Sequence, residues 1–366
     1  MKFKYLNPIA QLNSPTQWKK KSTQSANNRL LIFYDERNSQ RHCHSCVVFF
    51  ISYIIFPSMP AFFPPSKIAL LEERLPGALA LLDDCVVCPR NCRVNRAAGE
   101  TNICGMDARL KISSANLHFG EEPPISGIHG SGTIFLSGCN LKCAYCQNYP
   151  ISQLRHGEYM TSGDVAEAML ELERRGAHNI NLVTPTHYVP QMMESMLIAN
   201  RRGLTLPVVY NSSGYDKVET LRLLDGIIEI YMPDMRYSRE ESSLCYSQAK
   251  NYPEVNRAAI KEMHRQVGDL VVNGEGIAVQ GLLVRHLVLP EGIAGSREIF
   301  EFLASEISAD TYVSLMSQYF PANRAPSIKE ISRRLKNSEF KEAVDAFHGA
   351  GLHNGYIQPY PQSYAL

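Results

Sequence analysis

From residue 132 onward, short apolar runs alternate with segments in which apolar residues recur at helical spacing. Val165, Met169 and Leu172 share one helical face, after Thr161 or Ser162, which can cap a helix, and before Gly176, which can end it. Residues 281–289 are instead almost continuously apolar, as is typical of a strand buried on both faces of a parallel sheet.

This alternation predicts six strand–helix units. We expect strands at 132–137, 179–183, 207–210, 227–232, 281–289 and 311–316, and helices at 161–176, 189–202, 217–224, 238–267 and 296–308. Ser327 and Glu330 have the spacing of a capping box for a last helix. Strands separated by helices predict an α/β fold with a parallel sheet.

Polar residues follow the predicted strands, where parallel α/β folds place their functional groups. Each could be an ordinary loop or packing residue, but as a set they predict one functional rim. The candidates are Thr184, Pro185, Thr186 and His187, then Asn211, Ser212, Ser213 and Gly214, then Asp234 and Arg236, then Arg285 and His286, and finally Gln318 and Tyr319.

The first 65 residues differ from the rest. Residues 1–45 are rich in Lys, Arg, Asn, Gln and Ser, which favours disorder. The apolar run that follows, residues 46–63, is interrupted by Pro57 and Pro60. A membrane anchor, a targeting extension and a start codon placed too far upstream all fit; we favour the last, with Met59 as the start. We expect a four-cysteine segment at 66–115, a core domain at 116–326 and a C-terminal helix and tail at 327–366.

Composition narrows the function. The 366 residues are 45% hydrophobic, enough for a sizeable core, and the formal net charge is only +1. Nucleic-acid binding needs a basic face, so we expect no nucleic-acid partner. The ten cysteines occur mostly in tight groups. Such groups in a large chain indicate metal ligation rather than disulfides, which predicts a reducing, cytoplasmic location.

One group has the spacing C-x2-C-x3-C-x11-C, from Cys85 through Cys88 and Cys92 to Cys104. Four such thiols can close a tetrahedral site. The spacing predicts a metal but not its identity: structural zinc and an additional [4Fe-4S] cluster both use four thiolates. Cys43 and Cys46, with the histidines beside them, could bind metal, but we expect that pattern to be incidental.

A second group, Cys139, Cys143 and Cys146, has the spacing C-x3-C-x2-C and follows a predicted strand and Gly138. Three thiolates can hold three irons of a [4Fe-4S] cluster and leave the fourth iron open for a small molecule. With an aromatic residue, Tyr145, before the last cysteine, this stretch resembles the signature of the radical S-adenosylmethionine (SAM) superfamily. The alternative is a zinc site completed by a distant histidine.

The resemblance implies an open (β/α)6 partial TIM barrel. It also implies that the open iron binds SAM and that an electron from the cluster cleaves SAM to a 5'-deoxyadenosyl radical, which abstracts hydrogen from a substrate. Cys139, Cys143 and Cys146 would then be both metal ligands and catalytic residues. A flavodoxin- or ferredoxin-type protein would supply the electron.

Within the superfamily, residues 85–322 resemble a branch likened to the pyruvate formate-lyase activating enzymes. The phrases HFGEEPPISG, NLVTPTH, YNSSGYD, YMPDMRY and VRHLVLP carry this likeness. It implies SAM contacts from Asn211, Ser212, Asp234, Arg236 and Arg285. A glycine-rich GGEP stretch expected after the second strand is absent; NLVTPTH replaces it, so Thr184 and Thr186 are the candidate replacements.

Three functions follow as alternatives. The first is activation of a partner protein by formation of a glycyl radical. The second is radical chemistry on a small molecule or another target, and the third is a non-catalytic iron–sulfur or zinc protein. The open iron argues against the third. A small substrate would need a lid, and residues 238–275 are the candidate for it. We expect no membrane role. We also expect Cys245 to be an ordinary helix residue.

Overall fold

The computed structural model describes residues 19–25, 28–34 and 66–360. Contacts divide the chain into two units, Met1–Phe62 and Phe63–Leu366. In the first unit, strands β1 (Lys19–Ser25) and β2 (Asn28–Tyr34) pair antiparallel. Cys43, Cys46 and the apolar run that we considered as an anchor lie outside the described residues.

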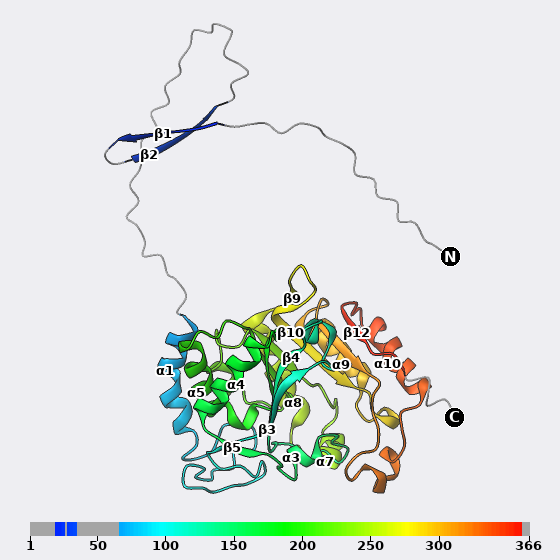
Figure 1. Cartoon of the computed structure of the whole chain (residues 1–366). Coiled ribbons are helices and arrows are strands. Elements are labelled where there is room, and N and C mark those ends of the chain that lie inside the picture. The colour runs from blue at the N-terminus through cyan, green and yellow to red at the C-terminus, as the bar shows by residue number, and fades with distance from the viewer. Residues whose placement is uncertain (1–18, 26–27, 35–65, 361–366) are drawn as a thin grey trace. The chain divides into compact units, whose positions relative to one another are not determined.

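The second unit is built on a ten-stranded sheet. Six of its strands run parallel in the order β4 (Ser131–Leu136), β6 (Ile180–Val183), β7 (Val208–Ser212), β8 (Ile230–Pro233), β10 (Ala278–Leu287) and β11 (Tyr312–Met316). These are the six strands that the hydrophobic pattern predicts, and they confirm a parallel-rich open α/β sheet (Figure 1).

Four further strands extend the sheet, and the pattern did not predict them. β3 (Leu110–His118) pairs antiparallel with β4 and with β5 (Glu158–Met160) at one edge. β12 (Gly355–Ile357) pairs parallel with β11 at the other edge, and β9 (Val271–Val272) pairs with β10. They are short or partly exposed, so they lack the long apolar runs by which buried strands are recognised.

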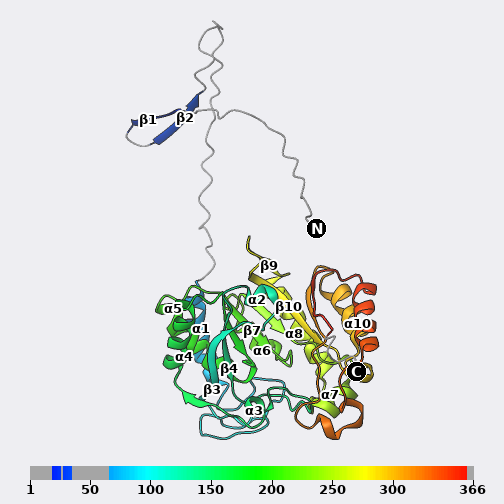
Figure 2. The same cartoon turned by 45° about the vertical axis from the view of Figure 1, so that its right-hand side comes forward.

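Helices cover the outer face of the sheet, as Figures 1 and 2 show. α1 (Lys67–Ala80) packs on α5 (Val189–Arg201), and α5 packs on α4 (Ser162–Arg174). Further along come α6 (Val218–Arg222), α7 (Glu240–Ser247), α8 (Tyr252–Val267), α9 (Ser296–Phe302), which continues as a π-helical turn at Leu303–Ile307, and α10 (Asn337–Gly349). No helix among the described residues has both the length and the apolar character needed to cross a membrane.

Alternate residues of the strands face two different cores. Leu182 and Tyr210 belong to the large core. Val209, Ile230 and Leu283 instead belong to a second, smaller core, which also contains Ile125 of the short helix α2 (Pro123–Ser126). Because side chains alternate across a strand, burial on both sides makes these strands almost uniformly apolar.

The helix start predicted at Ser327 is wrong. Residues Ala325–Ser327 and Lys329–Ile331 form separate single turns, and the last helix begins at Asn337. There Glu339 accepts a hydrogen bond from the Lys336 backbone amide (2.8 Å). A capping box requires a helix to follow, and the Ser327 hydroxyl instead bonds back to the Arg324 carbonyl (2.7 Å).

Candidate active site

The C-x3-C-x2-C loop begins where β4 ends. Gly138 adopts φ +82°, a left-handed conformation that turns the chain sharply. Cys139, Cys143 and Cys146 follow on this loop; Cys143 is buried and the other two are partly exposed. All three thiols are free, so they are available as ligands.

Hydrogen-bond donors surround the three sulfur atoms. The Leu141 amide donates to Cys139 Sγ (3.4 Å), and the Ser247 hydroxyl donates to Cys143 Sγ (3.0 Å). Ser152 Oγ lies 3.2 Å from Cys146 Sγ. Donors of this kind stabilise thiolates bound to iron, so the loop fits a [4Fe-4S] cluster.

Burial raises the pKa of Cys139 to about 12, and the charge of Cys143 adds to this effect, whereas Arg236 opposes it. The pKa of Cys146 is raised for the same reasons and is lowered in part by Ser152 and Arg236. Without a metal these thiols therefore stay protonated at neutral pH. A metal centre would have to displace their protons, and the nearby Arg236 cation favours the anionic form.

The segment that we considered as a lid packs against this loop. The Lys142 amide donates to the Ser247 carbonyl (3.0 Å) and the Ala144 amide to the Tyr246 carbonyl (2.7 Å), both at the end of α7. The Tyr145 hydroxyl lies 2.7 Å from that of Tyr237. The end of α7 thereby supports the cysteine loop from one side.

Four of the residues expected to contact SAM meet beside the loop. Arg285 donates to Asn211 Oδ1 (2.8 Å) and to Asp234 Oδ1 (2.9 Å), and Asp234 also forms an ion pair with Arg236. Asp234, Arg236 and Arg285 line one cavity together with Cys146. Arg236 Nε is buried and has no partner among the described residues. A small polar ligand in this cavity would reach the charged side chains of Asp234, Arg236 and Arg285 and also the cysteine loop.

Two residues of the predicted set, Thr186 and Ser212, bond to a buried carboxylate. Thr186 and Ser212 donate to the carboxylate of Asp216 (2.7 and 2.6 Å), which also accepts from the Tyr210 hydroxyl (2.9 Å). Thr184 has φ +62°, an uncommon backbone conformation for a threonine. Buried Asp216 thus ties the ends of β6 and β7 together, and the sequence pattern had not singled it out.

Two other residues of the predicted rim have packing roles. The His286 ring bonds to the Met235 carbonyl (2.7 Å) and to Ser296 Oγ (2.9 Å), and burial lowers its pKa to about 4. The Tyr319 hydroxyl donates to the Ile331 carbonyl (2.6 Å). Gln318, by contrast, lines the cavity beside Cys146.

The pattern also missed Glu121, although HFGEEPPISG drew attention to this stretch. Glu121 precedes α2, and its carboxylate lies 3.6 Å from the Arg285 guanidinium with the side chain only 8% exposed. Burial raises its pKa to about 7, against the opposing effect of Arg285. In the sequence, the two adjacent carboxylates before Pro-Pro could have drawn attention to Glu121. Only the fold, however, brings Glu121 close to Arg285 of β10.

The four cysteines of the earlier segment are also brought together. Cys85, Cys88, Cys92 and Cys104 line one enclosed cavity, to which His187 contributes as well. Within the described ranges, no three His, Cys, Asp or Glu side chains already form a single-ion site, and this holds equally for Cys139, Cys143 and Cys146.

A family model and two relatives are similar to parts of this chain. A family model described as the radical SAM superfamily matches residues 133–235. An uncharacterized protein of Methanocaldococcus jannaschii is 28% identical over 285 residues, which cover 75% of this chain and 78% of the relative. A second uncharacterized protein of that organism is 26% identical over 164 residues, 39% of this chain and 48% of its own length.

Two solved structures align with parts of this chain, both with TM-scores below 0.5. The [FeFe]-hydrogenase maturase HydG aligns with a TM-score of 0.42 and 13% identity over 60% of this chain, which spans 49% of the HydG chain. A radical SAM methyltransferase from Sphaerobacter thermophilus aligns with a TM-score of 0.44 and 12% identity over 81% of this chain and 94% of its own. The matched residues 133–235 carry the three-cysteine loop and the ends of β6, β7 and β8, so this is the part of the chain that is similar to the radical SAM superfamily.

Proposed function

We propose that this chain is an activase-like radical SAM enzyme that abstracts hydrogen from a polypeptide substrate. The observation that carries the radical chemistry is the loop of Cys139, Cys143 and Cys146 beside the charged cavity of Asp234, Arg236 and Arg285. When bound at the three cysteines, a [4Fe-4S] cluster supplies the electron that cleaves SAM to the hydrogen-abstracting 5'-deoxyadenosyl radical.

The residues of the chain would bind and orient SAM. SAM carries a carboxylate and cationic groups, and the cavity offers two guanidinium groups and the Asp234 carboxylate within hydrogen-bond reach of one another. Asn211 holds Arg285 in place through its side-chain oxygen.

Exposed aromatic residues near the loop support a polypeptide substrate. Tyr149 begins α3 (Tyr149–Ser152), three residues after Cys146, and is 36% exposed. Phe320 follows β11 and is 38% exposed, and Gln147 bonds to the nearby Gln318 carbonyl (3.2 Å). Aromatic side chains are frequent in surfaces that bind other proteins, and these two are partly exposed on segments next to the loop. A flavodoxin- or ferredoxin-type protein is the electron donor in this proposal.

The first test is production of 5'-deoxyadenosine. Anaerobically reconstituted protein is mixed with dithionite and SAM, and the product is followed by chromatography. We expect the wild type and a Cys245→Ala variant to form it, since the Cys245 side chain is exposed on α7. Cys143→Ala should form none. Equal product from Cys143→Ala would exclude radical chemistry at this loop.

The second test concerns the substrate. Activated protein is mixed with a purified glycyl radical enzyme, and electron paramagnetic resonance is recorded. A glycyl-type signal on the partner that requires SAM supports the activase assignment. If only small-molecule fractions raise the yield of 5'-deoxyadenosine and no protein radical forms, the alternative of a small-molecule substrate replaces it.

A further inference from the structure

We propose that Cys85, Cys88, Cys92 and Cys104 form a second metal centre, a site with four thiolate ligands for zinc or for the iron of an iron–sulfur cluster. Both choices share the same ligand chemistry. The proposal is independent of the proposed reaction, because none of the four thiols belongs to the loop of Cys139, Cys143 and Cys146.

Tight turns bring the first three thiols together. The Asn91 amide donates to the Cys88 carbonyl (3.0 Å), and Asn91 and Arg93 both have positive φ, 44° and 58°. The returning chain then pairs with Cys85. The Arg93 amide donates to the Cys85 carbonyl, and the Cys85 amide donates to the Val94 carbonyl, each at 3.0 Å. Cys85 therefore lies beside the chain that carries Cys92.

A second turn delivers Cys104. The Gly105 amide donates to the Asn102 carbonyl (2.8 Å), and Gly105 has φ +74°.

The surroundings suit a metal better than four unrelated thiols. Cys85 and Cys88 are each 7% exposed, and none of the four is in a disulfide. Val87 and Val94 line the same cavity, together with the guanidinium-bearing Arg90 and Arg96. The two cations would offset the negative charge of a four-thiolate centre, which apolar surroundings alone would disfavour.

His187 supplies an independent sign of unfilled coordination capacity at this cavity. It is 1% exposed, and its Nε2 lies 2.9 Å from the Ser137 carbonyl, which can only accept. Nε2 therefore carries the hydrogen, and Nδ1 keeps a lone pair that has no partner among the described residues.

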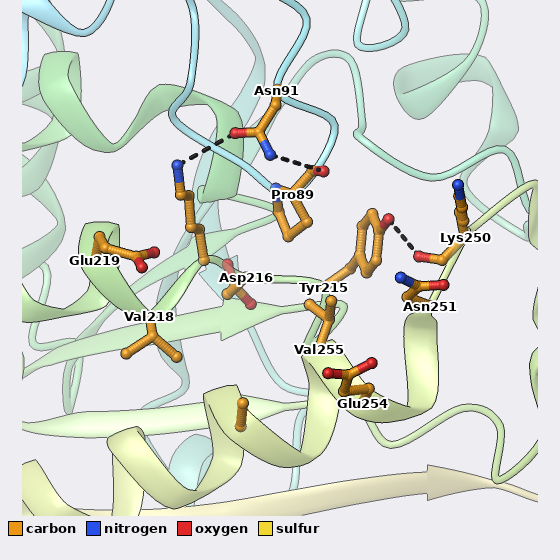
Figure 3. Close-up of a pocket in the computed structure, with 12 residues that line it drawn as sticks. Pro89, Asn91, Tyr215, Asp216, Val218, Glu219, Lys250, Asn251, Glu254 and Val255 are labelled. Atoms are coloured by element: carbon orange, nitrogen blue, oxygen red, sulfur yellow. Dashed lines mark hydrogen bonds between the residues drawn. The ribbon is translucent and has the colours of Figure 1, made fainter.

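The segment is held firmly on the core. Asn91 Oδ1, on the side chain labelled in Figure 3, accepts from Lys217 Nζ (3.2 Å), which also donates to the Val86 carbonyl (3.4 Å). The Thr220 hydroxyl donates to the Val87 carbonyl (2.8 Å). These anchors fix the backbone around Cys85 and Cys88, which lowers the cost of ordering the ligands when a metal binds.

The same segment braces the catalytic loop at both sides of Cys139. On one side, Arg90 Nε donates to the Asn140 carbonyl (2.8 Å). On the other side, Arg96 donates to the His187 carbonyl (2.6 Å), and the His187 ring in turn bonds to the Ser137 carbonyl. The second centre would thus stabilise the position of the loop that carries the first.

The test uses the full chain with Cys139, Cys143 and Cys146 all changed to Ala. This variant is reconstituted anaerobically, once with zinc and once with iron and sulfide, and desalted; metal and sulfide are then measured. We expect it to retain about one zinc or about four irons per chain. Sulfide with a visible charge-transfer absorption identifies a cluster, whereas zinc without sulfide identifies a mononuclear site. Either result supports the centre.

Two matched variants complete the experiment. Adding Cys88→Ser and Cys92→Ser should abolish the retained metal, and adding Cys245→Ser should leave it unchanged. Equal metal in all three variants, or none in the first, would overturn the proposal. If the variant with the serines does not fold, the melting temperature of the Ala variant is measured with and without metal; absence of any rise on metal binding also overturns it.

Discussion

Arg285 joins three parts of the candidate site, because its guanidinium contacts Asn211, Asp234 and Glu121. A buried cation with three partners sets the position of each of them. Truncating it leaves Asp234 and Glu121 buried with less compensation, which is costly for carboxylates. The residue is therefore a positioning group for whatever ligand the cavity binds.

We expect Arg285→Ala to weaken SAM binding by about tenfold or more, the loss typical of removing one partner of a buried charge pair. Equilibrium dialysis under anaerobic conditions measures this. Arg297→Ala on the exposed side of α9 is the control and should bind SAM like the wild type. Unchanged affinity in Arg285→Ala would remove Arg285 from the SAM site.

Glu121 predicts a dependence of stability on pH. Its pKa is raised to about 7 from the ordinary value of 4.5, chiefly by burial, so the folded state favours the protonated carboxyl. The contribution of Glu121 to stability is therefore greatest below about pH 4.5 and declines until about pH 7, by about 3 kcal/mol. Glu122, Asp234 and Arg285 face the same carboxyl and also act on it.

Glu121→Gln should remove this contribution. The free energy of unfolding of the variant, measured by urea titration without SAM, should exceed that of the wild type at pH 8 and approach it at about pH 5. Parallel curves for the two proteins across this range would contradict the raised pKa.

At the scale of elements, local capping and turn geometry decide where the helices and the loop begin. α4 starts with a complete capping box: Thr161 accepts from the Asp164 amide (3.1 Å), and Asp164 accepts from the Thr161 amide (2.9 Å). The sequence pattern offered Thr161 or Ser162 as the cap and did not identify Asp164 as the reciprocal partner. This is a local device that tertiary packing does not need to create.

Thr161→Ala should lower the free energy of unfolding by about 1 kcal/mol, the usual effect of losing an N-cap. Thr161→Ser keeps the hydroxyl and should lie within a few tenths of the wild type. Chemical denaturation compares the three proteins, and equal losses for Ala and Ser would show that the methyl group, not the cap, matters.

Gly138 marks the junction between β4 and the cysteine loop. A Cβ there would lie 2.6 Å from Met106 Cγ and 2.9 Å from the Cys104 carbonyl oxygen, and φ is +82°. Gly99 has φ +90° but nothing within 4 Å. Gly99→Ala therefore measures the cost of the backbone conformation alone, about 1 kcal/mol.

Gly138→Ala should cost clearly more than Gly99→Ala and should also lower the iron bound per chain. Melting temperature and iron analysis of the two variants test this. If both variants lose the same stability and bind the same iron as the wild type, the close packing of the two cysteine segments at Gly138 is unimportant.

At the scale of the whole molecule, the large core begins at Leu70 on α1 and runs through to Leu352 after α10. The four-cysteine segment and the C-terminal helix contribute to this core, since Val87 and Phe347 are both part of it. The second unit should therefore fold without residues 1–65.

A chain that starts at Ser66 tests this expectation. We expect its melting temperature to lie within about 2 °C of the full chain, because the shorter chain keeps all the core residues from Leu70 to Leu352. Calorimetry of both proteins provides the comparison, and a markedly lower value would mean that the first unit stabilises the second.

By itself the sequence determined the six parallel strands, most helices and the cysteine groups. Buried parallel strands need apolar runs, helices need periodic apolar faces, and three thiols on one loop stay together however the rest folds. The structure decided which polar residues meet. Arg285 reached Asp234 and Asn211 because adjacent strands bring their ends together, whereas Thr186 and Ser212 reached Asp216 instead. Contacts between distant segments, such as Glu121 with Arg285 and Arg90 with Asn140, depend on sheet order and loop paths, and local patterns carry no record of these.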